Sequence, residues 1–158
     1  MAGRRRDHDA GYVLDRIDTI LGQASLREHR FDRLRGDPGG TGRSAHLPVD
    51  AYWPGLALVV EVYERQHDHP PVAHFDKLER LTVSGVHRGE QRRLYDQRRR
   101  SAIPPANGLT LLVVRTSQLA VDRRGRLLRD AEADSVPLST LVGDALTDPG
   151  RVHESPPV

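Results

Sequence analysis

The chain has 158 residues, a net charge of +2 and no cysteine. This length suits one domain, and the lack of cysteine excludes disulfides, cysteine nucleophiles and cysteine-ligated zinc or iron–sulfur centres. Only one of the 24 basic residues is a lysine, Lys77, so a mechanism that requires a catalytic lysine has a single candidate.

The first third of the chain alternates helical patterns and turn signals. Residues 1–10 are polar and are expected to be flexible, whereas the apolar spacing over 11–22 predicts a helix. Residues 25–28 have the spacing of a capping box, which predicts the start of a short second helix. Residues 31–36 fit either a helix end or a first strand, and residues 37–44 form a turn or a mobile hairpin loop.

A hairpin is predicted next. Residues 46–53 read as a short strand, Pro54-Gly55 as a tight turn and residues 56–63 as a central strand buried on both faces. The longest apolar run, 56–60, is far too short to cross a bilayer, and no signal-type segment is present. We therefore expect a soluble cytoplasmic protein that does not engage membranes.

The second half begins with a polar stretch, 64–82, that reads as a long loop or as one irregular helix. Residues 88–100 are strongly charged and predict a helix, which Pro104-Pro105 should end. Residues 109–115 are a second buried strand, which can lie parallel to the earlier one because a crossover helix precedes it.

The C-terminal part predicts one or two helices over 126–146, broken by Pro137, and then a disordered tail. The chain is thus expected to be an α/β (α+β) protein with a mixed sheet flanked by helices. Its predicted organisation is a flexible segment, one domain with a core and a helical appendage, and a flexible tail, at 1–10, 11–146 (core 25–115, appendage 117–146) and 147–158.

Two carboxylates carry the main chemical hypothesis. Asp50 lies on the first hairpin strand and Glu61 near the end of the second, so antiparallel pairing can bring them together at the open end of the hairpin. Two carboxylates there can share Mg²⁺ or Mn²⁺, which would activate water and stabilise a phosphoryl transition state. The structural alternative is that Asp50 starts a turn and Glu61 merely ends a strand.

Histidine follows closely. His67 stands six residues after Glu61, near enough to orient a water or to protonate a leaving oxygen. With His69 it could also form a metal-binding His-x-His pair, although the following Pro70-Pro71 favours an exposed loop.

The charged helix over 88–100 suggests a second kind of site. Arg88, Arg92, Arg99 and Tyr95 fall on overlapping faces, where arginine can grip phosphates and tyrosine can stack on a base. The alternative is a solvated face that carries ion pairs within the helix.

These residues together resemble a known family. The stretch LPVDAYWPGLALVVEVYERQH at 47–67, the spaced arginines and Asp96 of the charged helix, and the strand at 109–115 resemble the PD-(D/E)xK, or restriction-endonuclease-like, superfamily. The nearest branch contains the very-short-patch repair endonuclease. The resemblance covers roughly residues 25–115.

The resemblance implies a restriction-endonuclease-like fold and a Mg²⁺- or Mn²⁺-dependent endonuclease, a hydrolase of ester bonds, acting on DNA. Asp50 and Glu61 would hold the metal, and His67 would assist proton transfer. Glu28, on an upstream helix, would complete the catalytic set, with Asp32 as a weaker candidate for that place.

One departure keeps other functions open. The superfamily's lysine would lie two residues after the acid, where this chain has Tyr63. The alternatives are therefore a catalytically inactive nucleic-acid-binding protein on the same scaffold and a small protein-interaction module. The sequence also leaves the oligomeric state open, a homodimer included.

Overall fold

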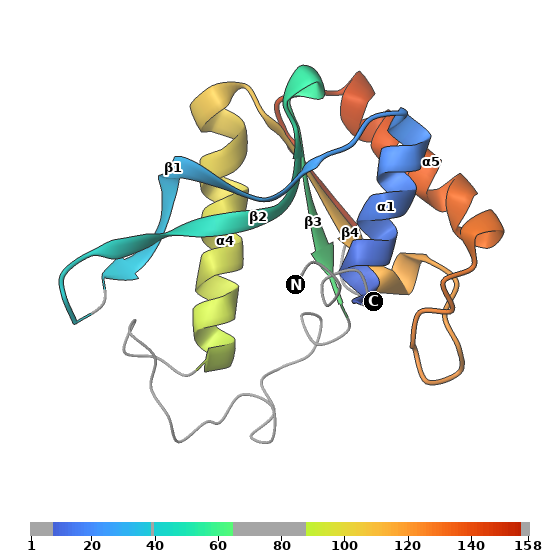
Figure 1. Cartoon of the computed structure of the whole chain (residues 1–158), viewed down its shortest axis with the longest axis horizontal. Coiled ribbons are helices and arrows are strands. Elements are labelled where there is room, and N and C mark those ends of the chain that lie inside the picture. The colour runs from blue at the N-terminus through green and yellow to red at the C-terminus, as the bar shows by residue number, and fades with distance from the viewer. Residues whose placement is uncertain (1–7, 39, 65–87, 156–158) are drawn as a thin grey trace.

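A computed structural model of the chain describes residues 8–38, 40–64 and 88–155. These residues form one five-stranded mixed sheet and three α-helices (Figure 1). The strands are β1 Leu26–Pro38, β2 Ser44–Trp53, β3 Leu58–Tyr63, β4 Thr110–Arg115 and β5 Val152–Glu154. The α-helices are α1 Asp9–Leu21, α4 Arg88–Asn107 and α5 Ala131–Thr147, and short 3₁₀ helices η1 and η2 occupy Pro54–Leu56 and Thr116–Gln118. This is the mixed α+β architecture that the sequence predicts.

The sheet follows the order of the chain, β1-β2-β3-β4-β5. β1, β2 and β3 form an antiparallel meander, whereas β4 and β5 join in parallel. The residues between β3 and β4 include α4, so the crossover inferred from the sequence is present. All six residues of β3 and of β4 are buried, as expected for central strands with helices on both sides.

Two apolar clusters lie on opposite faces of the sheet. Helices α1 and α5 pack on one face with Trp53, Val60 and Leu112, and α4 covers the other with Val59 and Leu111. In Figure 1, α1 and α5 lie on one side of the central strands and α4 on the other, behind the long β1–β2 hairpin.

The structure corrects three local predictions. Residues 25–28 do not start a helix, because β1 begins at Leu26 and pairs along β2. Helix α4 continues through Pro104 and Pro105 to Asn107, and Gly108, with φ 64°, follows it. Pro137 does not break the C-terminal helix, which is a single helix, α5, with that proline inside.

The expected disordered tail also differs. Val152–Glu154 pairs in parallel with β4 and so forms the fifth strand of the sheet. Arg100 holds the Glu154 carboxylate through two hydrogen bonds of 2.7 Å, and Arg115 donates a third. Side-chain ion pairs, which the polar composition of this segment does not reveal, thus fix it to the sheet.

Candidate active site

The site is built on one lateral row across β1, β2 and β3. The register that pairs Arg27 with Ala51 and His29 with Val49 sets Glu28 opposite Asp50. The register that pairs Ala51 with Val60 sets Asp50 opposite Glu61. Three of the four catalytic candidates proposed from the sequence therefore occupy one row of neighbouring strands.

Glu61 and Asp50 are in direct contact. The backbone ladder between β2 and β3 ends at the Ala51–Val60 pair. In the next row the Asp50 N–H donates to Glu61 Oε1 over 3.0 Å, and the Val62 N–H donates to Asp50 Oδ2 over 2.8 Å. The two carboxylates thus accept the hydrogen bonds that backbone carbonyls would otherwise accept, and the strands open at this point.

The backbone of the row is irregular on β1 and β2 as well. Along β2, Val49 belongs to the α4-side cluster, whereas Ala51 belongs to the cluster under α1 and α5. Odd-numbered residues therefore change face at Asp50. On β1, Glu28 has a φ of 50°, which is rare for a residue with a side chain. Irregular and strained backbone of this kind is concentrated at functional sites.

Burial and charge set the protonation of Glu61. The residue is only 5 % exposed on the α4 side of the sheet. Burial raises the pKa of Glu61 to about 8, and the negative charge of Asp50 adds to this rise, while the positive charge of Arg99 opposes it. Two adjacent carboxylates of this kind bind either a proton or a cation at neutral pH.

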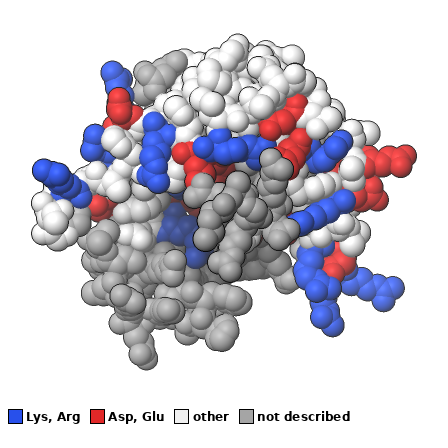
Figure 2. All heavy atoms as spheres, viewed as in Figure 1, with Lys and Arg blue, Asp and Glu red and all other residues white. Residues whose placement is uncertain are grey.

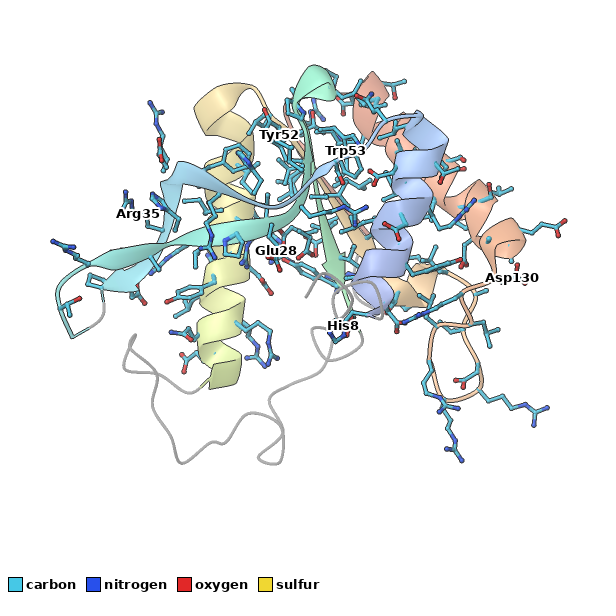
Figure 3. All side chains as sticks on the ribbon, in the orientation of Figure 1. His8, Glu28, Arg35, Tyr52, Trp53 and Asp130 are labelled. Atoms are coloured by element: carbon cyan, nitrogen blue, oxygen red, sulfur yellow. The ribbon has the colours of Figure 1, made fainter. Side chains whose placement is uncertain are left out.

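A cavity of about 520 Å³ opens beside the row. Glu28 and Asp50 line it together with Glu64, which directly follows β3, and His8, which precedes α1. Glu61 is not among its described lining residues, since its side chain lies towards α4. Figure 3 shows Glu28 on the hairpin near the centre of the molecule and His8 beside the N-terminal end of α1.

Arg27 fixes α1 to β1 at the rim of this cavity. Its guanidinium donates to Asp18 at 2.6 Å and to Asp15 at 3.0 Å, both on α1. These two aspartates are therefore neutralised within the fold, whereas Arg27 lies one residue from Glu28 and holds β1 against the helix at this row. The sequence did not predict a part for Glu64, Arg27 or α1 at this site, although the position of Glu64 just after a buried strand is a usable signal.

Arg99 belongs to the face of α4 that the sequence predicts to bind nucleic acid. Arg99 is largely buried, with its side chain 15 % exposed. It donates twice to the Pro48 carbonyl and once to Asp96, and its Nε lies 3.7 Å from Glu61 Oε2. Arg99 thus joins α4 to β2 and to the acidic row, and phosphate binding by its guanidinium stays a prediction.

Tyr95 is half-buried and held by contacts within the fold. Its hydroxyl accepts hydrogen bonds from the Asp37 N–H and from Gln91, and it lies against Gly36, where a Cβ would approach to 3.0 Å. The Arg98 guanidinium covers its ring. The tyrosine therefore packs α4 onto β1, and stacking of its ring on a base stays a prediction.

The remaining sequence candidates are placed as follows. Arg92 is half-buried on α4. Arg88 begins α4, but its side chain lies outside the described residues, as do His67, His69 and Lys77. Asp32 is 99 % exposed on β1 and lies 3.7 Å from His46, away from the row.

The position expected for lysine is also clear. Tyr63 lies on the α4 side of β3, almost fully buried, between the guanidinium groups of Arg100 and Arg115 at 5.1 and 5.4 Å. Its phenol does not line the cavity that Glu28 and Asp50 share. Burial is the largest cause that raises the pKa of the Tyr63 hydroxyl, and neighbouring acidic groups add to it. The hydroxyl is therefore uncharged, and Tyr63 does not supply the positive charge of a lysine ammonium.

The chemistry of the acidic row suits a hard divalent cation. Magnesium is usually bound by one or two carboxylates, with waters and substrate oxygens completing its shell, and Asp50 and Glu61 supply such a pair. Within residues 8–38, 40–64 and 88–155, no group of three or more histidine, aspartate or glutamate side chains is arranged to hold a metal ion. The observation that bears on a cation is the repulsion between the two groups, since the negative charge of Asp50 helps to raise the pKa of Glu61.

Comparisons with models of protein families, with characterised proteins and with solved structures returned no match to this chain. Among the described residues, no helix is both long and apolar enough to cross a membrane.

Proposed function

We propose that this protein is a cytoplasmic, divalent-cation-dependent endonuclease of the PD-(D/E)xK type that hydrolyses phosphodiester bonds in DNA. The observation that carries the proposal is the row Glu28–Asp50–Glu61, where the carboxylates of Asp50 and Glu61 each accept a backbone N–H of the opposite strand as the pairing of β2 with β3 ends. Glu61 is buried and Asp50 half-buried, and the charge of Asp50 opposes ionisation of the Glu61 carboxyl. A divalent cation would relieve this repulsion directly.

The residues of this chain would divide the work. Asp50 and Glu61 would hold Mg²⁺ or Mn²⁺, which supplies an activated water and neutralises charge on the phosphate. Glu28, across from Asp50 and on the same cavity, would orient that water through its carboxylate. His67 stays a prediction for proton transfer to the leaving oxygen, since it lies outside the described residues.

The experiment is cleavage of plasmid and duplex oligonucleotides with Mg²⁺, Mn²⁺ or a chelator. Asp50→Asn combined with Glu61→Gln should reduce cation-dependent cleavage by more than about 100-fold, because both anionic ligands are lost. Glu132→Gln combined with Asp144→Asn makes the same charge change on α5 and should leave cleavage unchanged. Circular dichroism checks that each variant folds, and cleavage that survives in the folded Asp50/Glu61 variant contradicts the proposal.

A second function is favoured by one observation. The Arg99 guanidinium lies 3.7 Å from Glu61 Oε2, so a positive charge of the chain already faces that carboxylate. Together with the buried Tyr63, this arrangement suits a nucleic-acid-binding protein that has lost catalysis. Salt-sensitive DNA binding without cleavage under any divalent cation would support this second function over the first.

A further inference from the structure

The β1–β2 hairpin extends beyond the sheet as a two-stranded ribbon. Backbone pairing of β2 with β3 covers only Ala51–Trp53, and Asp50 adds side-chain hydrogen bonds, so within the described residues the part of β2 from Ser44 to Val49 pairs with β1 alone. In Figure 1 this ribbon crosses in front of α4 and reaches well past it. One face of the ribbon packs on α4 through Leu34, Leu47 and Val49.

Arginines occupy the other face, here called the outer face. Arg30 pairs with Pro48 and Arg35 pairs with His46. Along β2, Pro48 and His46 alternate with Leu47 and Val49, whose side chains face α4, so Pro48 and His46 lie on the opposite face. Arg30 and Arg35 therefore point away from α4. Glu28 precedes Arg30 by two residues on β1, so the outer face runs directly to the acidic row.

The guanidinium groups of the outer face are oriented but not neutralised. Arg30 donates to the His46 carbonyl, and Arg35 donates to the carbonyls of Asp32 and Ser44 at 3.1 and 3.3 Å. These acceptors are uncharged. By contrast, the arginines Arg27, Arg98, Arg99, Arg100, Arg115, Arg126, Arg129 and Arg151 all face carboxylates.

The charge distribution on this side of the molecule agrees with that contrast. Figure 2 shows mostly basic side chains among the charged groups at the left, where the ribbon lies, and acidic groups nearer the centre. Exposed Arg43, in the turn that joins β1 and β2, continues the basic surface and has no hydrogen-bond or ion partner within the described part of the chain. One exposed carboxylate, that of Asp32, lies among these groups, 3.7 Å from His46 Nε2, and this contact is an ion pair only when the histidine is protonated.

We infer that the outer face of the β1–β2 ribbon binds the sugar-phosphate backbone of duplex DNA and leads it to the acidic row. This inference rests on the proposed function. From Glu28 to Arg35 the ribbon spans about 20 Å, the length of roughly six base pairs along a duplex. Guanidinium groups held at fixed positions without carboxylate partners suit phosphate contacts, which position a duplex without reading its sequence.

The aromatic rings of the hairpin favour a duplex over a single strand. Phe31 and Tyr52 pack together at 5.0 Å between ring centroids, and both lie against the α4-side cluster. The outer face therefore lacks the exposed phenyl or phenol platform on which unpaired bases stack, as far as the described residues show.

The test is binding of a labelled duplex oligonucleotide in chelator, where cleavage plays no part, followed over a salt series. Arg30→Gln combined with Arg35→Gln should weaken binding at least about 10-fold and lower the slope of log affinity against log salt by about 2, because two phosphate contacts are lost. Arg123→Gln combined with Arg124→Gln removes the same charge from the loop before α5 and should bind like the unmodified protein.

A second variant separates charge from local structure. Arg30→Lys combined with Arg35→Lys keeps the charge and loses the fixed guanidinium geometry, so it should retain most of the salt slope. Unchanged binding by the Arg30/Arg35 glutamine variant overturns the inference, and tighter binding of single-stranded DNA, RNA or an acidic polypeptide overturns the assignment of duplex DNA. If the protein binds duplex DNA through the ribbon but does not cleave it, only the nuclease proposal is contradicted. If the protein cleaves DNA but the Arg30/Arg35 glutamine variant binds it as tightly as the unmodified protein, only the proposed DNA contact of the ribbon is contradicted.

Discussion

At the scale of single residues, Glu61 links the site to pH. Its pKa of about 8 in the folded protein compares with an ordinary value of 4.5. Below pH 4.5 the Glu61 carboxyl is protonated in both the folded and the unfolded chain, and its titration does not reduce the free energy of unfolding. As the pH rises towards 8 the unfolded chain ionises first, so the free energy of unfolding falls, by at most about 1.4 kcal/mol per pH unit.

Glu61→Gln should therefore flatten the pH dependence of stability between pH 4.5 and 8 in chelator, measured by urea unfolding. The amide oxygen can still accept the Asp50 N–H, so the fold is kept. Glu154→Gln is the contrasting variant. Burial would raise the pKa of Glu154, but hydrogen bonds and charge from Arg100 and Arg115 outweigh it and lower the pKa. The ionised Glu154 therefore stabilises the folded protein at neutral pH, and this stabilisation is lost as the pH falls. If Glu61→Gln leaves the pH dependence of the free energy of unfolding unaltered, the raised pKa of Glu61 is contradicted.

Glu28 is the second residue with a measurable signature. A side chain at φ 50° strains the backbone, and glycine removes that strain. Glu28→Gly should raise the free energy of unfolding by about 0.5–1 kcal/mol while reducing cation-dependent cleavage. Ala57→Gly, at φ 49°, offers the same relief without loss of a carboxylate and should leave cleavage intact. Lower stability in Glu28→Gly alone would show that contacts of its carboxylate outweigh the strain.

At the scale of elements, β5 depends on one carboxylate. Glu154 joins Arg100 of α4 and Arg115 of β4 to the last strand, and the Arg115 side chain is only 5 % exposed. Glu154→Ala leaves that buried guanidinium without this carboxylate and should lower the free energy of unfolding by about 2–3 kcal/mol. Asp148→Ala removes only an exposed pair with Arg151 and should cost less than about 1 kcal/mol. Equal losses in denaturant titrations would contradict this account of β5.

At the scale of the whole molecule, local patterns predict the sheet well where burial is complete. The two continuous apolar runs gave β3 and β4 correctly, and the crossover helix between them gave their parallel pairing. The turn at Pro54-Gly55 was enough to bring Asp50 and Glu61 together. These features depend on short-range sequence signals that the tertiary structure does not override.

Other parts of the molecule depend on contacts that a sequence pattern does not contain. Residues 25–28 resemble a helix start, yet β1 begins at Leu26, and its pairing with β2 places Glu28 beside Asp50. The arginines of α4 look alike in sequence, but Arg99 turns inward because Pro48 O, Asp96 and Glu61 lie within its reach. The contrast between the ribbon arginines, which face uncharged acceptors, and the arginines that face carboxylates likewise depends on how β1 and β2 pair.

The two kinds of strand pairing in the sheet also bear on the order of folding. β1 and β2 are joined by a short turn and lie close in sequence. By contrast, Leu58 of β3 pairs with Thr110 of β4, which lies on the far side of the crossover in the sequence. Closing a long loop loses more chain entropy and delays parallel pairing. We therefore expect the arginine ribbon and its Glu28–Asp50 pair to assemble early, before α4 closes over Glu61. The repulsion between Asp50 and Glu61 would then arise late in folding, when most of the sheet has already formed and its stability can offset this repulsion.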